Sequence, residues 1–155
     1  MATKTANASA GLQHIRELLD HDRPSEALNL ITHSGNDSPA MENARGVCLL
    51  RLGRLDEAIS VLRDVAFQGL PVIPSDAPVL FQVNFAVAML RANYDKGEAL
   101  VISDRLNGNE HPEAAKLKAA VRQWKKSLGP LGRLRCRLGL YPAKPVPLDE
   151  RAGAV

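Results

Sequence analysis

Apolar residues recur at intervals of three and four along most of the chain, which is the period of a helix with one buried face. These residues are mainly alanine and leucine, and aromatic residues make up only 4% of the sequence. A β-sandwich would favour β-branched and aromatic residues instead. The pattern therefore predicts an all-α fold of closely packed helices.

A tripeptide of glutamate, alanine and an aliphatic residue occurs three times, at residues 26–28, 57–59 and 98–100. Each copy follows a polar break, which in turn follows a segment of helical period. In the middle copy, Gly46 and Ala58 are small residues where two helix backbones would approach closely. We expect a repeated helix–turn–helix unit.

The middle copy resembles the tetratricopeptide repeat (TPR) family, whose unit is a helical hairpin of about 34 residues. Gly46, Gly53 and Ala58 occupy the family's small positions, and its large apolar positions hold Leu49, Leu55 and Leu62. Gly53 stands where the first helix would stop, because glycine accepts the left-handed conformation of many C-terminal caps. The resemblance implies a right-handed α-α superhelix.

The outer copies depart from the family's pattern, since Asp22 and Tyr94 stand where the turn glycine is expected. The resemblance covers about residues 9–106. It implies a TPR-like solenoid of three repeats, over residues 9–36, 39–68 and 78–107.

Three segments lie outside the repeats. Residues 1–8 are expected to form a flexible N-terminal tail, and residues 112–128 a helix whose apolar stripe covers the last repeat. Residues 129–155 form a basic, proline-rich C-terminal tail, and its last eight residues are expected to be disordered. This tail could dock on a neighbouring copy's groove, giving self-association, or fold over its own.

The resemblance also implies a function, because the first helices of such repeats line a concave, protein-binding surface. The chain is then a non-enzymatic adaptor or scaffold that binds a peptide or helix of another protein. Two asparagines could bond a peptide backbone and the arginines could bind carboxylates, although several of these side chains could instead pack between helices or face solvent. Carried over by alignment on the recurring alanine, the groove residues are Leu12, Arg16, Leu19, Asn43, Val47, Leu50, Arg51, Phe81, Asn84, Ala88 and Arg91.

Motifs for catalysis are absent: the chain has no nucleophile elbow, P-loop, dinucleotide fingerprint or His-Glu-x-x-His helix. Cys48 lies within an apolar helical segment, and Cys136 lies between two arginines with no base nearby in sequence. We therefore expect no enzyme, no metal and no cofactor. Two cysteines are too few for a disulfide scaffold, which favours a cytoplasmic location. No apolar stretch is long enough to span a membrane.

Charge is distributed unevenly: residues 1–110 hold 10 basic and 14 acidic residues, whereas residues 111–155 hold 10 basic and 3 acidic residues. A second hypothesis is therefore binding of nucleic acid or an anionic surface through this basic region. A third is a small secretion chaperone, because bacterial three-repeat TPR chaperones have a similar length. The basic patch comprises Lys116, Lys118, Arg122, Lys125, Lys126, Arg133, Arg135 and Arg137.

Overall fold

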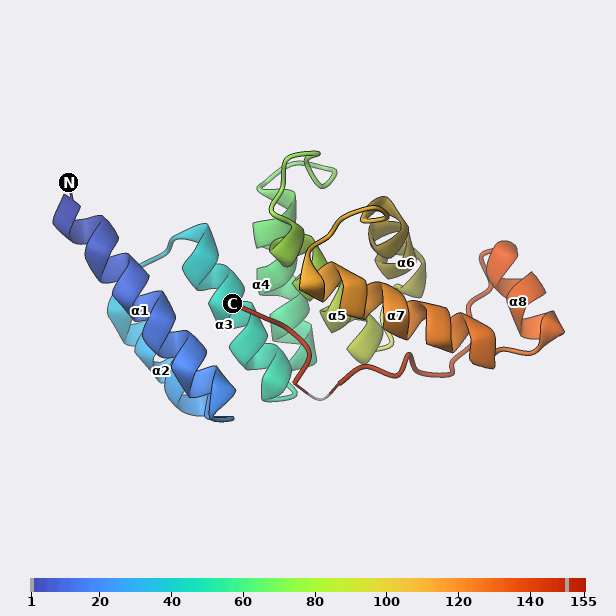
Figure 1. Cartoon of the computed structure of the whole chain (residues 1–155), viewed down its shortest axis with the longest axis horizontal. Coiled ribbons are helices and arrows are strands. Elements are labelled where there is room, and N and C mark those ends of the chain that lie inside the picture. Colours follow the sequence, from blue (N-terminus) through green and yellow to red (C-terminus); the bar gives the residue numbers. More distant parts are fainter. Residues whose placement is uncertain (1, 150) are drawn as a thin grey trace.

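A computed structural model describes residues 2–149 and 151–155, with side chains from residue 10 onward. Within that part of the chain every regular element is an α-helix, which confirms the all-α class (Figure 1). The helices are α1 (Ala2–Asp20), α2 (Pro24–Ser34), α3 (Pro39–Arg51), α4 (Leu55–Phe67), α5 (Val79–Arg91), α6 (Lys96–Arg105), α7 (Pro112–Ser127) and α8 (Pro130–Arg137).

Helix α1 begins at Ala2 and so runs through residues that we assigned to an N-terminal tail. The segment from residue 2 to residue 10 contains four alanines and no proline or glycine. Because alanine has the highest helix propensity, the backbone of this segment continues the helix that the apolar residues after it begin.

The turns after α1, α3 and α5 each contain one residue with positive φ, namely Asp22 (57°), Gly53 (75°) and Asn93 (53°). The third differs from our expectation, which placed Tyr94 at the turn position. Asparagine tolerates the left-handed conformation better than tyrosine does. The turn from Asn93 to the start of α6 is one residue longer than its counterpart after Gly53, so Asn93 occupies the position instead.

Consecutive helices from α1 to α7 pack against one another, and α1 also contacts α3, α3 contacts α5, and α5 contacts α7. The odd-numbered helices thus form a continuous row, which we call the front row. Gly46 allows α3 to approach α4 closely, because a Cβ atom on Gly46 would lie 2.5 Å from Leu62 Cγ. Two clusters of buried side chains form the core, a smaller one in α1–α3 and a larger one from α3 to α7.

Helix α8 has no buried residue and is set apart from the other helices (Figure 1). Beyond it the chain reverses, runs along α7 and ends over α3. We call residues 139–149 and 151–155 the returning tail. We expected its last eight residues to be disordered; residues 151–155 instead bond to the front row, through contacts described below. Proline keeps the segment extended, and an extended main chain has unpaired groups to offer.

Candidate functional site

The returning tail is held first near the end of α7. Lys96 donates from Nζ to the carbonyl oxygens of Pro142 (2.6 Å) and Lys144 (3.1 Å). Trp124 donates from Nε1 to the same Lys144 oxygen at 2.9 Å. We call this arrangement the Lys96–Trp124 clamp. It recognises main-chain oxygens, and therefore an extended segment rather than particular side chains.

The clamp places a buried ammonium group where an apolar residue is more common. Lys96 is only 7% exposed, and its Nζ lies 5.8 Å from the centre of the Trp124 ring. Burial lowers the pKa of Lys96, because the charged form loses water. The two carbonyl oxygens and the face of the indole ring compensate this loss in part. The lysine is thus positioned to hold the tail.

The second anchor is a pair of buried side-chain amides on adjacent helices of the front row, Asn43 in α3 and Asn84 in α5. Asn84 accepts from the main-chain N of Ala154 at 3.1 Å and donates to the Ala154 oxygen at 2.8 Å. Its other amide hydrogen goes to Asn43 Oδ1 at 2.9 Å, and Asn43 Nδ2 lies 3.5 Å from the Ala154 oxygen. The asparagine pair therefore bonds both main-chain groups of one residue.

Arginines fix the residues on either side of Ala154. Arg51 donates from Nη2 to the Gly153 oxygen at 3.0 Å, and Arg16 donates from Nε to the Val155 oxygen at 2.6 Å. Arg51 also donates from Nη1 to the Leu19 oxygen, at 2.7 Å, near the end of α1. Carbonyl groups at a helix C-terminus lack intrahelical donors, so this bond caps α1 while it orients Arg51 toward the tail.

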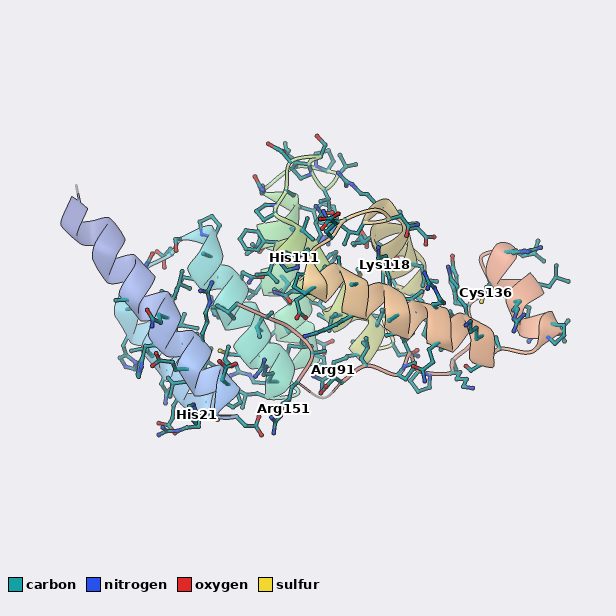
Figure 2. The ribbon with its side chains drawn as sticks, in the orientation of Figure 1. His21, Arg91, His111, Lys118, Cys136 and Arg151 are labelled. Atoms are coloured by element: carbon teal, nitrogen blue, oxygen red, sulfur yellow. The ribbon has the colours of Figure 1, made fainter. Side chains whose placement is uncertain are left out.

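Arg91 repeats part of this arrangement one hairpin further along, because its Nη1 donates to the Leu50 oxygen near the end of α3 at 3.3 Å. Figure 2 shows Arg91 below α7, near the path of the tail. The two arginines thus join successive front helices, a structural role in addition to any contact with a ligand.

Gly153 is the closest point of approach between the tail and α3. A Cβ atom there would lie 3.3 Å from both Leu50 Cδ2 and Val47 Cγ1, tighter than ordinary van der Waals contact. The φ angle of Gly153 is +105°, which side chains with a Cβ rarely adopt. Both observations require glycine at this position.

A cavity of 660 Å³ lies between the front row and the tail. On one side it is lined by Arg16 and Leu19 of α1, Arg51 of α3, and Val83 and Val87 of α5. Helix α7, the last member of the front row, and residues 147–149 and 151–155 of the tail complete the lining. The tail thus occupies part of a hollow that extends beyond it.

Seven of the eleven predicted groove residues lie at the tail or its cavity: Arg16, Leu19, Asn43, Val47, Leu50, Arg51 and Asn84. The other four lie elsewhere or have another contact. Leu12 packs on the α1–α3 cluster, Ala88 is buried in the larger cluster, Phe81 lines a separate pocket against α3 and α4, and Arg91 bonds Leu50.

The register of α5 explains why Val83 and Val87 were missed. Our alignment counted back from Ala99, across a turn that is one residue longer than its counterpart in the middle repeat. Counting from the positive-φ residue Asn93 selects Val83 and Val87 in place of Asn84 and Ala88. Because Asn84 also contacts the tail, the groove uses α5 residues from both counts, and either count alone misses part of the site. Lys96 had a weaker signal, because the resemblance to the TPR family implies a large apolar residue at that position.

The basic patch divides between three places. Lys116 lines the cavity and pairs with Glu113 at 2.7 Å, a contact that raises the pKa of Lys116. Arg137 lines a pocket between α6 and α8, and Arg135 is exposed on α8. The remaining five line a hollow between α6, α7 and α8: Lys118, Arg122, Lys125, Lys126 and Arg133. Of these, Lys118 is labelled in Figure 2.

Residues 2–149 and 151–155 contain no cluster of three or more His, Cys, Asp or Glu residues that could hold a metal ion. Among the described helices, none is both long enough and apolar enough to cross a membrane. No protein-family model, curated protein or solved structure matches this chain.

Proposed function

We propose that the protein is a non-enzymatic interaction module, built as a TPR-like solenoid, whose front row binds an extended peptide of another protein. The observation that carries this proposal is the pairing of Asn84 with both main-chain groups of Ala154. A side-chain amide that donates and accepts across one peptide unit reads the backbone of an extended ligand. An adaptor with such a groove matches the architecture that the repeats imply.

The burial of the asparagine pair supports a built site. Asn43 and Asn84 are 1% and 0% exposed with the tail in place. Each polar group left without a partner in such surroundings costs about 1–3 kcal/mol, so the groove requires a polar ligand or water at this point. An extended peptide supplies both a donor and an acceptor at the required spacing, as residue 154 does.

The test is selection from a displayed library of random peptides. The bait is the full chain carrying Gly153→Val, which strains the tail's own anchor and frees the groove. The change Arg51→Ala with Asn84→Ala, added to this bait, removes one charged and two neutral hydrogen bonds, about 3 kcal/mol together, so selected peptides should bind about a hundredfold more weakly.

The matched control is Arg45→Ala with Asn29→Ala, which removes the same residue types from exposed positions of α3 and α2. Selected peptides should bind the control bait as they bind the parent bait. Recovery of no binding peptide, or binding that is equal in the groove variant and the control, would refute the proposed function.

A second candidate function is supported by α8 and the residues after it. Leu131, Leu134, Leu138 and Leu140 are each between 53% and 69% exposed, which is unusual for large apolar side chains so close together. The first three share one helical face, and Arg135 and Arg137 are exposed beside them. Leucines with adjacent arginines suit an anionic bilayer surface better than nucleic acid, which offers no apolar phase for the leucines.

Sedimentation with phosphatidylcholine vesicles, with and without phosphatidylserine, tests this candidate. Binding should require phosphatidylserine and should be lost with Leu131→Ser and Leu138→Ser together. Leu70→Ser with Val72→Ser is the control, because these loop residues are 52% and 67% exposed. If the leucine variant retains binding, or if the chain binds duplex DNA and no vesicle, the membrane interpretation fails.

A further inference from the structure

We infer that the groove selects peptides with glycine at the position of Gly153 and an aliphatic residue two positions later, and that the returning tail is a built-in competitor for this site. The inference rests on the proposed function, because it specifies the ligand of the same groove. The tail shows how such a ligand lies: residues 153, 154 and 155 each give a main-chain oxygen to a side chain of the front row.

The requirement for glycine comes from two independent features. The φ angle of +105° disfavours every residue that has a Cβ atom, and the space beside Gly153 is already filled by Val47 and Leu50. Both of these side chains are fully buried with the tail in place, so their own packing resists the small shift that a Cβ atom would need. Backbone strain of this kind corresponds to a loss of affinity of about tenfold or more.

The next two positions differ in what they require. Ala154 is partly exposed and lines the cavity, so its side-chain position can accept a larger residue while Asn84 holds its main chain. Val155 packs against the cluster formed by α1, α2 and α3, which favours an aliphatic side chain. The ligand pattern is therefore glycine, any residue, aliphatic residue.

The tail is tethered independently of this site, because the Lys96–Trp124 clamp holds residues 142 and 144. Residues 151–155 can therefore leave the asparagine pair while the rest of the tail stays attached. A tethered segment has an effective concentration in the millimolar range, so it competes strongly with a free peptide. A partner segment must bind better than the tail or act when the tail is displaced.

The experiment measures binding of a fluorescent, C-terminally amidated peptide of residues 148–155 by anisotropy. The full wild-type chain should bind it weakly, because the tail occupies the site. The Gly153→Val chain should bind it at least tenfold more tightly. Gly35→Val is the control: Gly35 also has positive φ, at +57°, but lies at the end of α2 with no atom within 4 Å of its Cβ position. That chain should bind as the wild type does.

Variant peptides test the pattern on the Gly153→Val chain. The Gly153→Ala peptide should bind at least tenfold more weakly than the parent peptide, and so should the Val155→Ser peptide. The Arg151→Ala peptide should bind nearly as tightly as the parent peptide, because Arg151 borders the cavity but its side chain is exposed. Equal binding of the Gly153→Ala peptide would overturn the glycine requirement and leave the proposed function intact.

Three further outcomes concern the tail as a competitor. If the Gly153→Val chain binds none of these peptides but binds peptides from the random library, the tail is not a ligand of the groove and the inference fails alone. If neither source yields a binder, the proposed function fails with it. Sedimentation of the wild-type chain should show a monomer. If the wild-type chain is instead a dimer, and Gly153→Val dissociates it, then the tail binds the groove of a neighbouring copy, and competition within one chain is overturned.

Discussion

Replacing Gly46 with alanine should destabilise the protein, although alanine is the better helix former. Gly46 lies in α3 between Asn43 and Val47, which both contact the returning tail. A Cβ atom at Gly46 would lie 2.5 Å from both Cγ and Cδ2 of Leu62 in α4, far closer than ordinary contact. Because Cγ is the branch point of the leucine, rotation of one methyl group cannot relieve the overlap.

The magnitude follows from two opposing effects. Alanine in place of glycine favours a helix by about 1 kcal/mol. Overpacking a filled core costs about 1–3 kcal/mol, and Leu62 is fully buried, so the cost belongs in the upper part of that range. We expect Gly46→Ala to lower the free energy of unfolding by about 1–2 kcal/mol.

Gly11→Ala is the matched control, because Gly11 is also inside a helix. Its Cβ atom would meet only Met41 Cε, at an ordinary 3.8 Å, so this variant should gain about 0.5–1 kcal/mol. Urea unfolding measures both, followed by the fluorescence of Trp124, the single tryptophan, which is fully buried.

A double variant with Leu62→Ala isolates the contact. Leu62→Ala alone should cost about 2–5 kcal/mol, and the double variant should cost at least about 1 kcal/mol less than the two single changes added together. If Gly46→Ala stabilises the protein as Gly11→Ala does, then α3 and α4 do not approach closely at Gly46, and the position of α3 in the front row is wrong.

Three further predictions concern single residues. Burial raises the pKa of the Cys48 thiol to about 12, so a thiol reagent near neutral pH should modify the partly exposed Cys136 and leave Cys48 unmodified until the chain unfolds. The folded-state pKa of Cys48 exceeds its unfolded value of about 8.5, so its contribution to the free energy of unfolding is complete below that pH. This contribution declines as pH rises toward 12, by at most about 1.4 kcal/mol per pH unit. Between about pH 8 and about pH 10, urea unfolding should therefore show a larger loss of unfolding free energy for the wild type than for Cys48→Ala. Asp95→Ala should cost about 1 kcal/mol of unfolding free energy in the same assay, because Asp95 Oδ1 accepts from the Glu98 main-chain N at 3.0 Å and caps α6. Ser38→Ala should cost less, because the Ser38 side chain accepts from the Met41 main-chain N at the longer distance of 3.4 Å. Equal losses in the two variants would contradict this ranking.

The positions of the helices could be predicted from the sequence because local signals set them. Pro39 after Ser38 starts α3, and the residue two positions after its end, Gly53, has the left-handed conformation that glycine favours. Helical periodicity and caps depend on residues three or four apart, so they are visible without knowledge of the fold. The same residues supported the resemblance through which Asn43 and Asn84 were singled out.

Register across a turn could be predicted only in part. The recurring alanine fixed α3 relative to α4 and selected Asn84 in α5, but the additional residue before α6 left Val83 and Val87, which line the cavity, outside the prediction. Asn93 rather than Tyr94 has the left-handed conformation because the turn before α6 is one residue longer than the turn before α4. Such a difference changes which residues of the preceding helix an alignment selects, and in α5 the residues selected by both registers reach the tail or its cavity.

The sequence by itself determined that this protein is helical, which segments form α2 to α7, and which asparagines suit a peptide backbone, although it did not predict that α1 starts at Ala2 or that α8 forms. Only the tertiary structure decided that its own residues 151–155 meet those asparagines, with Arg16 bonding a residue 139 positions away. The physical reason is that helix formation uses neighbours in sequence, whereas the returning tail is fixed by main-chain groups that any residue carries. Pairing of that kind leaves no pattern of residue types to read, except at Gly153, where only the folded neighbours Val47 and Leu50 reveal why glycine is required.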